Sequence, residues 1–155
     1  MNAPVFLNHD EAYPEGYLAT ILKEVKTIAM VGASANPTAF SYGVLRVLHE
    51  TGYNMIPVNP RLAGGDIRGL KVYASLADIP EPIDMVQVFR DKSAFYGIAE
   101  EAIAVGAKVL WGQIGVVDPA AARLAEEAGM KVVMDKCPKI ELFRPFWKPK
   151  LHLEI

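Results

Sequence analysis

Three segments of the sequence share a pattern in which a helical segment ends at a glycine and an apolar strand begins within two residues. They have the sequences GYNMI from Gly52, GAKVL from Gly106 and GMKVV from Gly129. Glycine adopts the left-handed backbone conformation that ends a helix at little cost, which turns the chain back toward a sheet. A chain that passes from helix to strand in this way three times is expected to lay its strands side by side, joined by helices.

The spacing of apolar residues predicts alternating strands and helices. Strands are expected at 27–31, 54–58, 84–89, 108–111 and 131–135, with a short one at 71–73, and helices at 16–25, 41–51, 92–105 and 119–128. Ser41 is expected to cap the second helix and Asp118, followed by Pro119, the last. The strands are apolar throughout, as in parallel sheets covered on both faces. The pattern predicts an α/β fold, namely a Rossmann-like, doubly wound, mainly parallel sheet in three α/β/α layers that forms a single domain.

The length of 155 residues suits one domain with its own core. We expect this domain over residues 27–141, after an N-terminal helical extension at 1–26. Residues 142–155 are expected to form an aromatic, proline-containing tail that packs on the domain or on a second subunit. Because Phe143, Phe146 and Trp147 would otherwise expose apolar area, this tail favours a homodimer.

Composition and charge exclude several classes of protein. The formal net charge is −2 and no run of Lys and Arg occurs, so no nucleic-acid partner is expected. The apolar runs are far shorter than the roughly 20 residues of a membrane span, and the first residues do not resemble a signal peptide. A single cysteine permits no internal disulfide, and these features together indicate a cytoplasmic protein. The scattered His9, His49 and His152 give no metal-site spacing and no catalytic arrangement.

Doubly wound sheets bind ligands outside the carboxyl ends of their strands, near the switch in strand order. Five segments that follow the predicted strands are therefore expected to converge on one crevice. The first segment combines a glycine turn, small residues that let a phosphate approach the backbone, and a helix N-terminus with free N–H groups. Its candidate binding residues are Gly32, Ala33, Ser34, Asn36, Pro37, Ser41 and Tyr42. It matches neither G-x-G-x-x-G nor Walker A, so an ordinary connecting loop is the alternative.

The second segment distinguishes between nucleotides. An NAD-binding domain usually has Asp or Glu at the end of its second strand, where this sequence has Asn59, Pro60 and Arg61. Arg61 suits a ribose phosphate, either the 3′-phosphate of coenzyme A or the 2′-phosphate of NADP. A solvated loop arginine is the alternative interpretation.

The third and fourth segments add further candidates. Phe89 ends the strand at 84–89 and Arg90 follows it, where Arg90 suits either a phosphate or a salt bridge to Asp91 or Asp118. Gln113, close to Gly115, suits a hydrogen bond to an amide or to a pantetheine carbonyl, or it is simply a turn residue.

Cys137 follows the last strand, directly after Lys136. A thiol at this position could face the reactive end of a ligand, and Lys136 would favour the thiolate. A buried cysteine that only fills space fits nearly as well. Thiol chemistry through Cys137 is therefore an alternative function, weakened because no histidine can be paired with it.

Together these motifs resemble the CoA-binding domain family, specifically its small stand-alone bacterial type. The resemblance covers 27–141 and rests on VGAS with Asn36-Pro37, on PVNP, VFR and WGQIG, and on MDKCP around Cys137. The same fold forms the N-terminal domain of the succinyl-CoA ligase α subunit. The resemblance implies that the first loop holds the CoA phosphates, that a basic residue after the second strand lies near the adenosine, and that a cysteine matching Cys137 lies near the thiol.

The ligase also needs a second domain with a phosphorylated histidine, for which this sequence has no residues left, so ligase activity is not implied. We predict that the chain binds coenzyme A or an acyl-CoA as a non-catalytic binding or sensing module. The alternatives are an NADP-dependent oxidoreductase, supported only by the fold and Arg61, and a structural or partner-binding protein that has lost its ligand.

Overall fold

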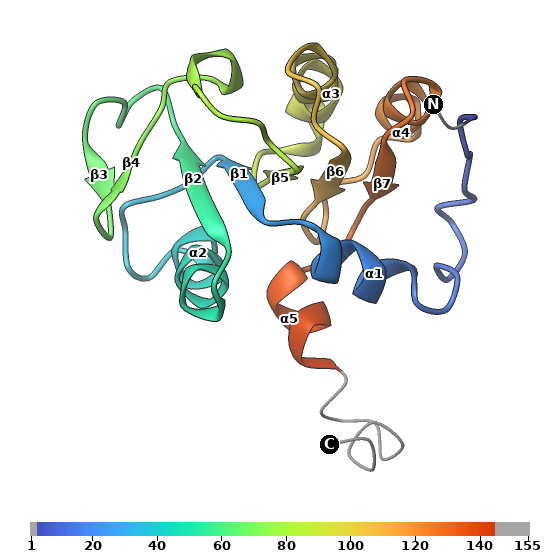
Figure 1. Ribbon diagram of the computed structural model, residues 1–155, viewed down its shortest axis with the longest axis horizontal. Helices are drawn as coiled ribbons and strands as arrows, with labels where there is room; N and C mark the ends of the chain where they lie inside the picture. Colours follow the sequence, from blue (N-terminus) through green and yellow to red (C-terminus); the bar gives the residue numbers. More distant parts are fainter. Residues whose placement is uncertain (1–2, 145–155) are drawn as a thin grey trace.

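A parallel sheet lies at the centre of the computed structural model, which describes residues 3–144 (Figure 1). Its five strands are hydrogen-bonded in the order β2-β1-β5-β6-β7, and every pair is parallel. The strands are β1 (Thr27–Val31), β2 (Asn54–Val58), β5 (Met85–Val88), β6 (Val109–Gly112) and β7 (Lys131–Val133).

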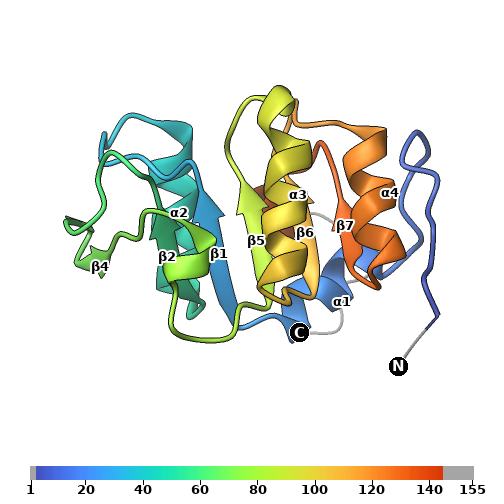
Figure 2. The ribbon, with the colours of Figure 1, turned by 90° about the horizontal axis from the view of Figure 1, so that it is seen from above.

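Helices cover both faces of this sheet. They are α1 (Tyr17–Glu24), α2 (Phe40–Thr51), α3 (Phe95–Ala104), α4 (Pro119–Glu127) and α5 (Pro138–Phe143), with short 3₁₀ turns η1 (Leu76–Asp78) and η2 (Lys92–Ala94). Helices α3 and α4 lie on one face, and α1, α2 and α5 on the other (Figures 1 and 2). This arrangement confirms the predicted Rossmann-like, three-layer α/β fold in a single domain.

The apolar strands supply both layers of the core. Along β1, Ile28 and Met30 pack in the cluster beneath α1, α2 and α5, whereas Ala29 packs in the cluster beneath α3 and α4. On β6, Trp111 packs beneath α1, α2 and α5, and Leu110 packs beneath α3 and α4; both are fully buried. Successive strand residues point to opposite faces, so a strand buried on both faces must be apolar at every position.

The predicted helix ends are confirmed, but one predicted helix start is wrong. Gly52, Gly106 and Gly129 all have positive φ angles, and Asp118 caps α4 through the N–H groups of Ala120 and Ala121. Ser41 is not an N-cap, because α2 begins at Phe40 after Ala39, whose side chain makes no capping bond. The Ala39 N–H bonds to the Asn36 carbonyl, so the chain turns into the helix before it reaches Ser41.

Two segments differ from the prediction. The strand expected at 71–73 is instead the end of a small antiparallel hairpin, β3 (Asp66–Ile67) and β4 (Leu70–Lys71), and Tyr73 makes only an isolated bridge to Val58. Pro138–Phe143 forms α5, where the sequence predicted the end of the domain and the start of a tail. Proline is favourable in the first turn of a helix, which the prediction overlooked. Phe146 and Trp147, on which the expected homodimer mainly rests, lie outside the described residues.

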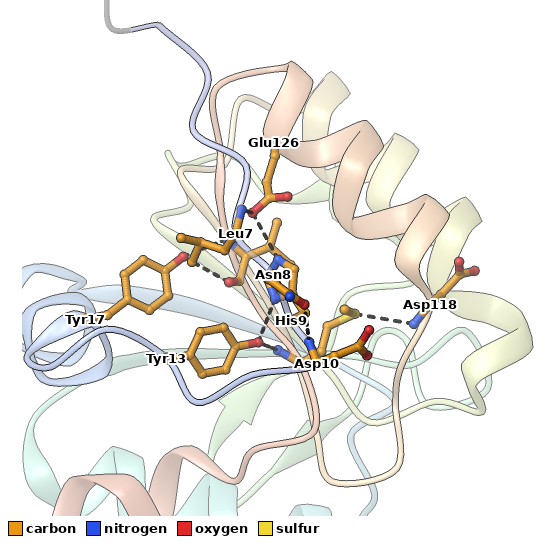
Figure 3. A network of polar contacts seen from close by, with 10 residues as sticks. Leu7, Asn8, His9, Asp10, Tyr13, Tyr17, Asp118 and Glu126 are labelled. Carbon is orange, nitrogen blue, oxygen red and sulfur yellow. Dashed lines mark hydrogen bonds and ion pairs between the residues drawn. The ribbon is translucent and has the colours of Figure 1, made fainter.

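The N-terminal extension is fastened to the exposed edge of β7. The Tyr17 hydroxyl donates to the Val132 carbonyl at 2.9 Å and accepts the Val132 N–H at 3.1 Å. The Tyr13 hydroxyl accepts the Met134 N–H at 2.8 Å (Figure 3). Two phenols therefore satisfy backbone groups that another strand would otherwise have to pair.

A half-buried histidine and a buried carboxylate extend this network. His9 Nδ1 lies 2.8 Å from the Tyr13 hydroxyl, and His9 Nε2 lies 3.0 Å from Glu126 Oε2, which also accepts the Leu7 N–H (Figure 3). Glu126 is only 3% exposed. The sequence offered no reason to connect His9 with a glutamate on α4, because 117 residues separate them.

The buried phenols predict loss of stability in alkaline solution. Burial raises the pKa of Tyr13 and Tyr17 above the ordinary value of about 10. The unfolded chain therefore releases these protons first, so the free energy of unfolding should be level below about pH 10 and fall above it. Tyr17→Phe should cost about 1–3 kcal/mol at pH 8, because it leaves Val132 unpaired, and should make the alkaline decline shallower. Urea unfolding from pH 8 to 11 measures both.

Tyr96→Phe, at an exposed tyrosine of α3, is the matched control and should leave both quantities unchanged. An equally steep alkaline decline in Tyr17→Phe would show that Tyr17 does not contribute to it.

Candidate functional site

The strand order places a switch point between β1 and β5, where the chain leaves the two strands toward opposite sides of the sheet. A cavity of about 600 Å³ opens there. Eight predicted site residues line it, namely Gly32, Ala33, Ser34, Asn59, Pro60, Arg61, Phe89 and Arg90. It is therefore built from the segments that follow β1, β2 and β5.

Sequence reasoning missed the far wall of this cavity. That wall is formed by Ala74, Ser75 and Leu76 before and within η1, and by Ile98 and Glu101 on α3. The parallel bridge from Tyr73 to Val58 carries the 74–76 segment past the end of β2. The helical spacing of three residues between Ile98 and Glu101 was the available signal, since it places both side chains on one face of α3.

Only a glycine fits at position 32, directly after β1. Its φ angle is 92°, and a Cβ atom built on it would lie 2.3 Å from the Phe89 carbonyl oxygen. Its N–H bonds to the Val58 carbonyl at 3.0 Å. The backbone after β1 is thus held against the ends of both neighbouring strands, and no residue with a side chain can occupy this position without displacing them.

Asn59 fastens the second loop to the first. Its Nδ2 donates to the Ala33 carbonyl at 2.8 Å, and its Oδ1 accepts the Arg61 N–H at 2.9 Å. Both polar ends of this side chain are therefore engaged by the protein, at the position where NAD-binding domains carry a carboxylate for ribose. In this chain the residue orients the loop that carries Arg61.

Two arginines at the cavity have no carboxylate partner. Within residues 3–144, the guanidinium groups of Arg61 and Arg90 make neither an ion pair nor a hydrogen bond. Neither salt bridge considered for Arg90 forms: Asp91 accepts the Ser93 N–H at 2.9 Å, and Asp118 caps α4. Two unpaired positive charges beside one cavity favour an anionic ligand.

The rest of the first loop lies outside the cavity lining. Asn36 is exposed and organises the loop, because its N–H bonds to Ser34 Oγ and its Oδ1 accepts the Thr38 N–H. Pro37 is exposed, Ser41 is 6% exposed within the core, and Tyr42 lies against Arg68. Helix α2 has no side-chain cap, and the N–H groups of Phe40 and Ser41 in its first turn have no hydrogen-bond partner among the described residues, whereas the Tyr42 N–H bonds to the Ala39 carbonyl.

The segments after β6 and β7 do not line the cavity, so the five segments do not share one crevice as predicted. Cys137 is 4% exposed and packs in the same cluster as Ala33 and Trp111, on the α2 and α5 face. The cavity opens instead toward the α3 face, where Leu76 and Ile98 pack. Cys137 therefore packs beside Ala33 of the cavity lining but does not itself line the cavity.

Asp135 joins the segments that follow β6 and β7. Its Oδ1 accepts the Gly115 N–H at 2.8 Å, and Trp111 Nε1 donates to the Lys136 carbonyl at 2.9 Å. Asp135 has a positive φ angle of 60°, which the sequence did not predict. Gly115 is therefore positioned by its neighbour across the sheet end, and Gln113 begins the same loop at 7% exposure.

Residues 3–144 contain no cluster of three or more His, Cys, Asp or Glu side chains that could hold a metal ion. None of their helices has the length and apolar character needed to cross a bilayer.

Comparison with known proteins supports a single family. Residues 26–142 match the CoA binding domain family. An uncharacterized protein, YneT, from Bacillus subtilis is 40% identical over 120 residues, which span 77% of this chain and 87% of that protein. The solved structure of Prb, a PH1109 protein redesigned for binding, superposes with a TM-score of 0.83 at 36% identity and covers 89% of this chain and 96% of its own.

A longer relative contains this unit as one part. The α subunit of an ADP-forming acetate–CoA ligase from Pyrococcus furiosus is 31% identical over 124 residues, which are 70% of this chain. The matched region spans only 26% of that subunit. The similarity therefore concerns one portion of the ligase subunit.

The close approach at Gly32 predicts a large effect of a single methyl group. Gly32→Ala should lower the free energy of unfolding by at least about 1–3 kcal/mol, because the residue must keep a positive φ and its Cβ would meet Phe89. Gly43→Ala on the adjacent helix is the matched control. No atom lies within 4 Å of a Cβ at Gly43, so this change should stabilise the protein by about 0.5–1 kcal/mol. Urea unfolding of the two variants should shift in opposite directions, and equal shifts would contradict the role of Gly32.

Proposed function

Since the chain belongs to the CoA-binding domain family, we propose that it binds coenzyme A or an acyl-CoA at the switch-point cavity, as a non-catalytic binding or sensing module. The observation that carries this proposal is the pair of unpaired arginines, Arg61 and Arg90, beside the glycine turn at Gly32. Coenzyme A carries three phosphate groups, which would provide the anionic partners that these two arginines lack.

In the proposed complex, the adenosine end lies in the cavity, with its 3′-phosphate against Arg61. Asn59 supports this contact indirectly, because it holds the backbone N–H of Arg61. The diphosphate lies along the backbone from Gly32 to Ser34, close to Arg90 and the uncapped N-terminus of α2. The apolar walls at Leu76 and Ile98 accommodate the adenine ring.

A role in binding coenzyme A is supported by the comparison with the ligase subunit. That protein is named as a CoA ligase, and this chain matches only 26% of its length. The similar region is therefore the part of such an enzyme that we expect to hold the coenzyme. The proposal also includes action in the cytoplasm and assembly as a homodimer, for which light scattering at high protein concentration is the test. A monomer would remove the homodimer from the proposal and leave the binding site unaffected.

NADP is the competing ligand, because Arg61 would also suit its 2′-phosphate. Linkage predicts that the ligand with the lower dissociation constant raises the melting temperature more at equal concentration. We expect coenzyme A to give a larger shift than NADP or NAD in thermal unfolding. An equal or larger shift with NADP would favour an oxidoreductase instead.

The contact at Arg61 predicts selective loss of affinity. Arg61→Ala should weaken coenzyme A about 10- to 100-fold, the effect of a charge-assisted hydrogen bond, and should barely change the affinity for dephospho-CoA, which lacks the 3′-phosphate. Isothermal titration calorimetry measures both. Arg46→Ala is the matched control, since Arg46 is an exposed arginine of α2 paired with Glu50. Equal losses for the two ligands would place the 3′-phosphate elsewhere.

A further inference from the structure

One fully buried polar side chain in the sheet is only half satisfied. Gln87 lies on β5 at 0% exposure, and its Nε2 donates to Gln113 Oε1 at 3.2 Å. Gln87 Oε1 accepts no hydrogen bond from the described residues. Native proteins pair nearly all of their buried polar atoms, so such an acceptor needs an explanation.

The position of Gln87 makes packing an insufficient reason for a glutamine. Its sheet neighbours are Met30 on β1 and Trp111 on β6, both fully buried and apolar. A parallel strand covered on both faces favours an apolar residue at such a site, and Met85 occupies the equivalent position two residues earlier on the same strand. The glutamine therefore weakens the core unless something bonds to its oxygen.

Gln113 connects this buried amide to the edge of the sheet where ligands bind. It directly follows β6, and its N–H bonds to the Val88 carbonyl at 3.2 Å, at the carboxyl end of β5. The loops after β1, β5 and β6 all lie along this edge (Figure 2). Within residues 3–144, Gln113 Nε2 has no hydrogen-bond partner either.

The two glutamines thus leave one acceptor, Gln87 Oε1, and one donor, Gln113 Nε2, unused at the end of neighbouring strands. A secondary amide carries one N–H and one carbonyl, which are the groups that this pair lacks. A carboxylate or phosphate would not suit it, because it has no proton for Gln87 Oε1.

We propose that the Gln87–Gln113 pair is a subsite for an amide of the pantetheine arm, and that Gln87 Oε1 accepts a hydrogen bond from the amide N–H. This inference rests on the proposed function. It adds the α2 and α5 side of the sheet end to a site whose nucleotide part lies in the cavity on the α3 side. The arm crosses over the end of β5 at Phe89, which borders the cavity and directly follows Val88.

The test compares coenzyme A with adenosine 3′,5′-bisphosphate, which has the nucleotide but no pantetheine. Gln87→Met keeps the volume of the side chain and removes its oxygen and nitrogen. It should weaken coenzyme A about 3- to 10-fold, the effect of one neutral hydrogen bond, and change the affinity for the bisphosphate less than 2-fold. Met85→Leu, on the same face of the same strand, should change neither affinity. Calorimetric titration of the three proteins with both ligands provides the comparison.

Coenzyme A analogues test the same contact in the unaltered protein, whether or not Gln87→Met folds. Replacing either pantetheine amide by an ester removes one N–H, and one of the two analogues should bind 3- to 10-fold more weakly. If neither analogue is weakened, or if Gln87→Met weakens both ligands equally or neither, the subsite does not exist and Gln87 has a structural role only. If the unaltered protein binds neither coenzyme A nor the bisphosphate, the proposed function itself is wrong.

Discussion

The contact between the backbone at Gly32 and the Phe89 carbonyl is the constraint on which the site depends. At this point the chain reverses its direction of travel across the sheet, so the loops after β1 and β5 separate and leave a cavity between them. The cavity keeps its form because Gly32 is fixed against both neighbouring strands and Asn59 ties the second loop to Ala33. Two arginines without partners then stand beside a rigid backbone rather than on free loops.

Much of this arrangement could be predicted because it follows from local chemistry. Apolar strands bounded by glycines specify where helices end and where a parallel sheet forms, and Gly52, Gly106 and Gly129 adopt the expected conformation. The carboxyl ends of parallel strands share one edge of the sheet, and this alone predicts Gly32 and Arg61 as candidate site residues. These inferences need only the order of elements along the chain and no knowledge of which strand lies next to which.

The parts that could not be predicted depend on neighbours distant in sequence. Strand order decides which face each loop serves, so the separation of Cys137 from the cavity was not visible before the sheet was known. Glu101 enters the site because α3 packs beside η1, and His9 meets Glu126 because the N-terminal segment crosses the end of α4. The early start of α2 arises from the turn at Asn36, where loop geometry outweighs the capping preference of Ser41.

The buried polar residues Glu126 and Gln87 differ in how completely their side chains are hydrogen-bonded, and this difference separates a structural role from a proposed binding role. Glu126 is buried, and its Oε2 accepts the Leu7 N–H and lies 3.0 Å from His9 Nε2, so its contacts fasten the N-terminal segment. Gln87 is buried more completely and yet retains an unused acceptor. The fold supplies partners for the buried carboxylate from residues more than a hundred positions away in sequence, yet among the described residues it supplies none for the amide oxygen of Gln87. The unmade bond lies near the carboxyl edge of the sheet, where the proposed amide subsite would use it.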